Sequence, residues 1–271
     1  RPGTIGDRGG NFVLQNSDLV IAIGCQLSIR QVSYAWSEFA KNAEIIAINN
    51  DRNELLKPII KIDYPVKVEI KTFFKSILES KINSIHGTNS KWYKWVKEIN
   101  NRYPVVTESH TNINNKFLSV YGFFKLLSNH ISKDSITVLA NGAACVVGLQ
   151  SIEVKKGQRV FTNAGASSMG YAICAAIGAA SASMAKPIYC IEGDGSIQMN
   201  IQELQTIVHH KLNLKIFWIN NDGYHSIKQT QLGMFNATKS GFKGADKSSG
   251  ISFPSAEKIA AAYGIKFLII K

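Results

Sequence analysis

Short apolar runs alternate with amphipathic helical stretches along this chain, and this alternation limits the fold more than any other feature. The runs are SDLVIAIG (17–24), AEIIAINND (43–51), SITVLANG (135–142), PIYCIEGDGS (187–196) and LKIFWINNDG (214–223). Each has the length of a buried strand, and several end in Gly or other turn-forming residues. Apolar strands joined through helices pair side by side in parallel. The sequence therefore predicts an α/β fold with two parallel, Rossmann-like sheets.

The two groups of runs are separated by a polar stretch, which indicates two domains. Residues 81–90 are rich in Asn, Ser and Gly, as a linker would be, and Pro104 ends a Trp-rich helix at 91–103. We expect one domain at 1–85, a linker containing a helix at 86–116, and a second domain at 117–271. A last strand is expected at 266–270.

Composition excludes several classes of function. The formal net charge is +12, but the lysines are scattered and no basic run is interleaved with aromatic residues, so no nucleic-acid partner is expected. No apolar run reaches the length of about 18 residues that would indicate a membrane span. The 4 cysteines form no CxxC pair and stand in apolar contexts, which favours buried thiols in the reducing cytoplasm.

Two of the apolar strands end in polar residues that could form one site. IEGDGS (191–196) and WINNDG (218–223) both place Gly and acidic or amide residues directly after a strand, and Asp194 stands 27 positions before Asn221. The carboxyl ends of parallel strands lie on one edge of a sheet, where ligands bind. A right-handed crossover through the helix at 197–210 brings the two ends close together. Either motif alone is a common turn, so the argument rests on the pair.

The residue types at these strand ends fit a metal-bridged diphosphate. Asp194 and Asn221 offer hard oxygen ligands suited to Mg²⁺, and the carbonyl of Gly223 offers a third. Gly193 and Gly195 allow a phosphate group to approach the backbone closely. The N–H groups at the start of the following helix favour an anion.

At this point the sequence resembles the thiamine diphosphate enzymes, in particular the group containing acetolactate synthase, pyruvate oxidase and benzoylformate decarboxylase. Their fingerprint is GDG, then 25 to 30 residues, then NN, and GDGSIQMNIQELQTIVHHKLNLKIFWINNDG follows it. The resemblance implies that Asp194, Asn221 and Gly223 are the Mg²⁺ ligands and that Gly193, Gly195 and Ser196 contact the diphosphate of the cofactor. The chain would be part of the central domain followed by the diphosphate-binding domain.

Other segments resemble the same family. In NAGASSMGYAICAAIGAA (163–180), Met169 stands where a bulky apolar residue supports the bent cofactor, and the carbonyl of Ser167 would accept from the pyrimidine 4'-amino group. Relatives often have Gly at the position of Ser167. In LANGAACVV (139–147), Gly142, Ala143 and Ala144 align with the loop around the diphosphate, where many relatives carry Gln and His. Tyr224 and His225 follow NNDG at the mouth of the implied site and are candidate cofactor contacts, and His225 is also a candidate catalytic residue that touches the substrate.

The first domain resembles the central domain of the family, which binds FAD in acetolactate synthases without a redox role in the main reaction. Arg30 and Asp51 stand where relatives contact FAD, and Asn49 replaces a common Asp. A structural domain without FAD fits the sequence as well, because no GxGxxG motif is present.

The resemblance implies decarboxylation of a 2-oxo acid, pyruvate in the first place, with carboligation as in acetolactate synthase. Another 2-oxo acid decarboxylase, an acyl transferase of the same family, and a non-catalytic partner that keeps the fold are alternatives. The glutamate that activates the cofactor is expected outside this chain, on a pyrimidine-binding domain, since family members are about twice as long. We therefore expect a homodimer or homotetramer of a longer polypeptide, and little activity from this chain alone.

Overall fold

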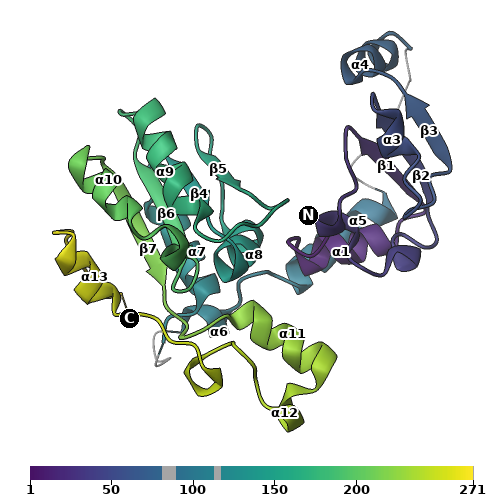
Figure 1. Cartoon of the computed structure of the whole chain (residues 1–271). Coiled ribbons are helices and arrows are strands. Elements are labelled where there is room, and N and C mark those ends of the chain that lie inside the picture. The colour runs from purple at the N-terminus through teal and green to yellow at the C-terminus, as the bar shows by residue number, and fades with distance from the viewer. Residues whose placement is uncertain (81–89, 113–116, 271) are drawn as a thin grey trace. The chain divides into compact units, whose positions relative to one another are not determined.

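The computed structural model describes residues 1–80, 90–112 and 117–270, and it divides into two compact units (Figure 1). The first unit covers Arg1–Val105 and the second Val106–Lys271. Each unit has its own parallel sheet, which confirms the predicted fold class.

The helices and strands of the first unit alternate as the apolar runs predict. They are α1 (Arg8–Gln15), β1 (Leu19–Ile23), α2 (Ile29–Val32), the 3₁₀ helix η1 (Trp36–Glu38), β2 (Glu44–Asn49), α3 (Arg52–Leu55), β3 (Tyr64–Lys67), α4 (Ile70–Glu79) and α5 (Lys91–Arg102).

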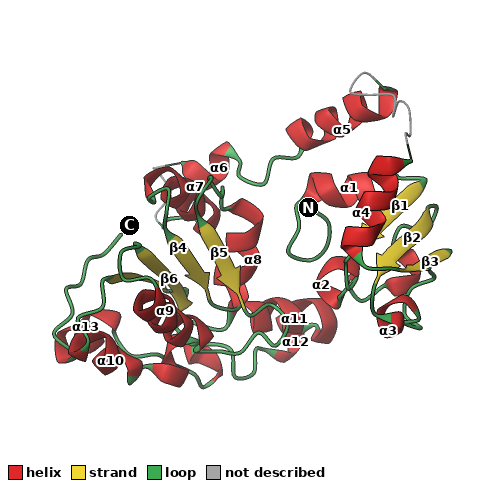
Figure 2. Ribbon diagram, turned by 90° about the horizontal axis from the view of Figure 1, so that it is seen from above, coloured by secondary structure: helices red, strands yellow, loops and turns green. Residues whose placement is uncertain are grey.

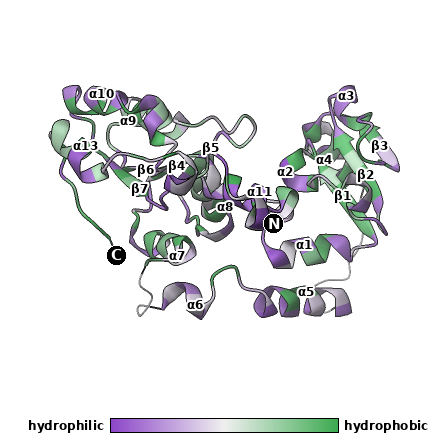
Figure 3. Ribbon diagram, turned by 60° about the horizontal axis from the view of Figure 1, so that its bottom comes forward, coloured by the Kyte–Doolittle hydropathy of each residue, from purple (hydrophilic) through white to green (hydrophobic). Residues whose placement is uncertain are grey.

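The first sheet has the strand order β1-β2-β3, and all its pairs are parallel. Ala22 of β1 pairs with Ala47 of β2, and both side chains are buried. Leu55 of α3 and Val32 of α2 join them in the core of this unit. In Figure 3 β1 and β2 are largely green, the colour of hydrophobic residues, and β2 is mostly buried, whereas Leu19 and Ile21 of β1 are exposed.

Helix α5 belongs to the first unit in the structure. It packs against α1, and the rings of Phe12 and Tyr103 lie 4.8 Å apart between their centroids. Most of the predicted linker at 86–116 that the structure describes is therefore folded against one unit or the other. Residues 86–89 and 113–116 of that linker lie outside the described residues.

The second unit continues the alternation over a longer stretch. Its elements are α6 (Glu108–Thr111), α7 (Val120–His130), β4 (Ile136–Leu139), α8 (Gly142–Ser151), β5 (Arg159–Thr162), α9 (Tyr171–Ala182), β6 (Ile188–Gly193), the 3₁₀ helix η2 (Ile197–Asn200), α10 (Glu203–His209), β7 (Leu214–Ile219), α11 (His225–Phe235), α12 (Ala237–Ser240), the 3₁₀ helix η3 (Lys247–Ser249) and α13 (Ala256–Ala262).

The second sheet has the parallel strand order β5-β4-β6-β7. Figure 2 shows α7 and α8 on one face of this sheet and α9 and α10 on the other. From β4 the chain continues to β5 on one side, and from β5 it crosses over β4 to β6 on the other side. The order in which strands are added therefore reverses between β4 and β6. Such a switch point leaves a crevice at the carboxyl ends of the two strands, where ligands bind in open α/β sheets.

The core of the second unit lies between this sheet and its helices. Phe124 of α7, Leu139 of β4, Ile173 of α9 and Ile191 of β6 are completely buried. Burying side chains of this size contributes roughly 1.5–3 kcal/mol each. The core therefore fixes β4 and β6, whose ends form the switch point.

The structure differs from the sequence-based expectations at the C-terminal segment and at two of the cysteines. The expected strand at 266–270 is not formed, and Leu268 and Ile269 are exposed because these residues pair with no strand of the sheet. Cys25 and Cys174 are exposed, whereas Cys145 and Cys190 are buried as predicted. Among the described residues, no helix is both long and apolar enough to cross a membrane.

Two helical glycines provide a test of this packing. A Cβ on Gly148 of α8 would lie 2.9 Å from Cζ of Phe124, whereas a Cβ on Gly178 of α9 would meet no atom within 4 Å. Gly178→Ala should raise the free energy of unfolding by up to about 1 kcal/mol through helix propensity. Gly148→Ala should lower it by about 1 kcal/mol or more, because overpacking exceeds that gain. Urea unfolding of both variants measures the difference, and equal effects would contradict the described core.

Candidate functional site

Asp194 lies directly after β6 and joins the two loops that the sequence pairs. Its backbone N–H donates to the carbonyl of Ile219 at 3.0 Å, which continues the pairing of β6 with β7. Its side chain is only 4% exposed. Oδ1 accepts from the N–H of Gly195 at 2.8 Å, and Oδ2 accepts from the N–H groups of Asn221 and Gly223 at 3.1 and 3.3 Å. The structure thus brings Asp194, Asn221 and Gly223 together.

Opposing influences act on the Asp194 carboxyl. Burial raises its pKa above the ordinary value, the three backbone N–H donors lower it, and the negative charge of Asp222 raises it. Asp222 itself is exposed and has φ 53°, a left-handed conformation that Asp and Asn tolerate better than most residues. This left-handed residue turns the chain so that the Asn221 and Gly223 N–H groups both face Asp194.

A third segment, around Ala245 and Asp246, packs against the NNDG loop. The N–H of Tyr224 donates to the carbonyl of Ala245 at 2.8 Å, and Gly223 forms an antiparallel bridge with Asp246. A Cβ at Gly223 would overlap the Ala245 carbonyl, so this approach requires glycine. Lys228 of α11 lies 2.6 Å from Asp246, and this hydrogen-bonded ion pair holds the pKa of Asp246 well below its usual range.

Tyr224 packs over the glycine turn. Its ring lies so close to Gly195 that a Cβ there would overlap it, and it makes an edge-to-face contact with Phe253 at 5.3 Å between centroids. His225 is the first residue of α11 and is exposed. Tyr224 thus supports the turn that holds Asp194, and His225 is accessible beside it.

The segment containing Ser167 and Met169 lies next to the same turn. The N–H of Gly170 donates to Ser196 Oγ at 3.0 Å, and Ser196 is only 5% exposed. The hydroxyl of Ser196 is therefore engaged inside the protein. Met169 is half-buried. This contact links the residue directly after Met169, three positions after Ser167, to the GDGS turn.

Ser167 has φ 51°, a left-handed conformation that glycine adopts more readily than serine. Its carbonyl accepts a hydrogen bond from Nδ2 of Asn141 at 3.2 Å.

Gly142, Ala143 and Ala144 form the first turn of α8, after β4. No side chain caps this helix start, so its first N–H groups are suited to an anion. Gly142 has φ 57°, and a Cβ there would lie 3.6 Å from Oγ of Ser226 near the start of α11. The start of α8, which follows β4, therefore lies beside the start of α11, which follows the NNDG loop.

The donor set fits a hard cation. It consists of the Asp194 carboxylate, the Asn221 side-chain amide and the Gly223 carbonyl, which are the oxygen ligands that Mg²⁺ prefers. Within the described residues no group of three or more His, Cys, Asp or Glu side chains could hold a metal ion. The unused lone pairs of the Asp194 carboxylate leave room for a cation.

Arg30 and Asp51 lie at the carboxyl edge of the first sheet. Arg30 belongs to the short helix α2 after β1, and Asp51 follows β2. The Asp51 carboxylate caps α3 by accepting from the N–H of Asn53 at 2.8 Å. Nδ2 of Asn49 donates to the Cys25 carbonyl at 3.4 Å and so links the two strand ends.

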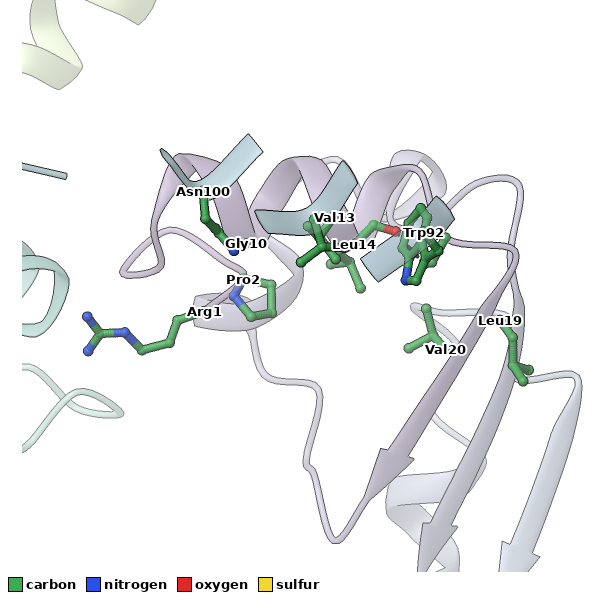
Figure 4. Close-up of a pocket in the computed structure, with 11 residues that line it drawn as sticks. Arg1, Pro2, Gly10, Val13, Leu14, Leu19, Val20, Trp92 and Asn100 are labelled. Atoms are coloured by element: carbon green, nitrogen blue, oxygen red, sulfur yellow. Dashed lines mark hydrogen bonds between the residues drawn. The ribbon is translucent and has the colours of Figure 1, made fainter. Parts of the chain in front are cut away.

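A cavity of about 430 Å³ lies in the first unit between α1, β1 and α5. Figure 4 shows Val13, Leu14, Leu19, Val20 and Trp92 around it. Its lining is mostly apolar and contains none of the residues predicted to bind a cofactor, metal or substrate.

Sequence reasoning missed several residues that hold the candidate site together. Asn141, Asn200 and Glu192 donate or accept hydrogen bonds between its segments. Glu192 had a detectable signal, because it is the only charged residue in the apolar strand IYCIEG. Asn141 precedes α8 and Asn200 ends η2, and neither had such a signal.

Comparisons with known proteins agree with this arrangement. Residues 140–271 match the C-terminal TPP binding domain of the thiamine pyrophosphate enzymes, and residues 1–77 match their central domain. Thiamine pyrophosphate is another name for thiamine diphosphate. The chain therefore belongs to the thiamine pyrophosphate enzyme family.

Its relatives include acetolactate synthase large subunits. The one from Cyanidium caldarium is 31% identical over 97% of this chain and 44% of that protein. Isozyme 1 from Escherichia coli K12 is 29% identical over 88% of this chain and 42% of that protein. The chloroplastic acetolactate synthase 1 of Nicotiana tabacum is 27% identical over 94% of this chain and 38% of that protein. The chain thus spans less than half the length of these relatives.

The conformation of Ser167 is open to a direct test. Ser167→Gly should stay within about 1 kcal/mol of the wild-type free energy of unfolding, because relief of the left-handed strain offsets the added freedom of the unfolded chain. Ser167→Val should lower that free energy by about 2 kcal/mol, since a β-branched residue is poorly accommodated at positive φ. Chemical denaturation distinguishes the two. A valine variant as stable as the glycine variant would contradict the described backbone.

Proposed function

We propose that this chain is the metal- and diphosphate-binding part of a thiamine diphosphate- and Mg²⁺-dependent enzyme that decarboxylates a 2-oxo acid, with pyruvate as the first candidate, and joins the remaining fragment to a second carbonyl compound. The observation that carries the proposal is the Asp194 carboxylate, which holds the GDGS and NNDG loops together at the switch point. The resemblance to acetolactate synthase large subunits supports the choice of pyruvate.

Each predicted residue has a role in this proposal. Asp194, Asn221 and the Gly223 carbonyl would hold Mg²⁺, and the backbone of Gly193, Gly195 and Gly142–Ala144 would surround the diphosphate with Ser196 behind it. The Ser167 carbonyl and Met169 would orient the pyrimidine and the bent cofactor. Thiamine diphosphate, when bound, supplies the nucleophilic carbon that attacks the ketone of the substrate. His225, exposed beside Tyr224, would contact the substrate.

The proposed enzyme is larger than this chain. A homodimer or homotetramer, with an activating glutamate from a pyrimidine-binding domain, would complete the site. FAD at Arg30 and Asp51 stays a prediction, and the proposed reaction does not depend on it. A decarboxylase of another 2-oxo acid or an acyl transferase is the second candidate, because the described residues include many of those proposed for the cofactor but few for the acceptor.

Asp194→Ala tests the metal site. The variant should lose Mg²⁺-dependent binding of thiamine diphosphate, at least about 100-fold in Kd, because a charged ligand is removed and the two loops lose their common acceptor. Asp222→Asn, which changes the exposed neighbouring carboxylate and suits the left-handed backbone, is the matched control and should still bind. Calorimetric titration with and without Mg²⁺ measures both. Unchanged binding by Asp194→Ala would refute the proposed metal site.

Release of CO₂ identifies the substrate. The full-length polypeptide that carries this chain should release CO₂ from pyruvate when thiamine diphosphate and Mg²⁺ are added, and its Asp194→Ala variant should not. The carbon product then names the acceptor. Cofactor binding without CO₂ release from pyruvate, but with release from another 2-oxo acid, would favour the second candidate.

A further inference from the structure

Glu192 is a carboxylate in the middle of the core of the second unit. It lies in β6, two residues before Asp194, and its side chain is completely buried. Burying a charged group without partners costs several kcal/mol, so a buried glutamate calls for compensating contacts. Burial raises the pKa of Glu192, and the Ser196 hydroxyl and the Ile173 N–H lower it.

The contacts of Glu192 lie at the start of helix α9. Its Oε1 accepts from the N–H of Ile173 at 3.2 Å, whereas Oε2 has no hydrogen-bond partner. The N-cap of α9 is Gly170, which has φ 77° and no side chain to cap the helix. Because the first N–H groups of a helix lack partners within it and favour a negative charge, Glu192 acts as the missing cap from a neighbouring strand.

The residues around Glu192 also fix the segment that leads into α9. Ser196 Oγ accepts from the N–H of Gly170, and Nδ2 of Asn200 donates to the Gly170 carbonyl at 3.1 Å. A Cβ on Gly170 would lie 2.6 Å from that Nδ2, so the two segments are in close contact. Both peptide groups of Gly170 are thus bonded to residues that follow Asp194.

These bonds connect two parts of the proposed cofactor site. Ser167 and Met169, three and one positions before Gly170, are assigned to the pyrimidine side, and Gly193–Ser196 are assigned to the metal and diphosphate. Resting on the proposed function, we propose that Glu192 is a positioning residue, which holds the start of α9 against β6 and thereby sets the distance between the pyrimidine side and the diphosphate side of the site.

Affinities for two different ligands distinguish this positioning role from a general role in stability. Thiamine diphosphate with Mg²⁺ uses both sides of the site, whereas inorganic pyrophosphate with Mg²⁺ uses the diphosphate side alone. Glu192→Ala should raise the Kd for thiamine diphosphate about tenfold or more and change the Kd for pyrophosphate by less than about twofold, since loss of one charged hydrogen bond corresponds to at least that factor. Glu192→Gln, which keeps the length and an acceptor oxygen, should restore most of the lost affinity.

Two further variants control the experiment. Glu203→Gln changes a glutamate in the first turn of α10, whose carboxylate accepts from Thr206 within the same helix, and should leave both Kd values unchanged. If Glu192→Ala does not fold, as thermal unfolding would show, Glu192→Asp carries the test. It keeps the charge but is one methylene shorter, so affinity for thiamine diphosphate should fall while affinity for pyrophosphate persists.

The outcomes are distinct. Equal losses of affinity for both ligands in the folded variants, or no loss for thiamine diphosphate, would overturn the positioning role and leave the proposed function intact. A wild-type protein that binds neither ligand would overturn the proposed function and the positioning role with it.

Discussion

The candidate site depends on one buried carboxylate. Asp194 accepts hydrogen bonds from its own turn and from two residues of the loop after β7, so neither loop can move without leaving a buried charge unpaired. The Ala245–Asp246 segment closes behind the second loop through Tyr224 and Gly223. Hydrogen bonds between distant segments therefore preform the crevice at the switch point, and the strands β6 and β7 provide the rigid base that such a site requires.

The sequence predicts the sheets and the pairing of the GDGS and NNDG loops because both follow from local patterns. Apolar runs of strand length are visible in the letters, and parallel strands place their carboxyl ends on one edge. The same reasoning fails at 266–270, where the apolar residues have strand character but no strand of the sheet pairs with them. Strand propensity describes fit to a pleated surface, and it cannot establish that a neighbouring strand exists.

The bonds that connect the loops were outside the reach of sequence patterns. Asn141 bonds to the carbonyl of Ser167, 26 positions later, and Glu192 to the N–H of Ile173, 19 positions earlier. No periodicity links such pairs, because each depends on how strands are ordered in space. The left-handed backbone of Ser167 is hidden for a different reason, since serine gives no local sign of positive φ.

Glu192 and Asp194 illustrate how neighbouring carboxylates acquire different tasks from their surroundings. Burial raises the pKa of both carboxyl groups. The protonated form of each therefore favours the folded state at low pH, and this contribution to the free energy of unfolding is lost as the pH rises through the folded-state pKa. Burial therefore disfavours the charged form of both carboxylates in the fold. The charge of Glu192 is directed at the start of α9, where backbone N–H groups meet it. The carboxylate of Asp194 meets two N–H groups of the NNDG loop, and a cation bound in the proposed metal site would offset the cost of its charge. A buried charge at this strand end lowers the stability of the protein without a ligand, and a bound cation restores that stability. Selection for binding, rather than for stability, would retain such a residue.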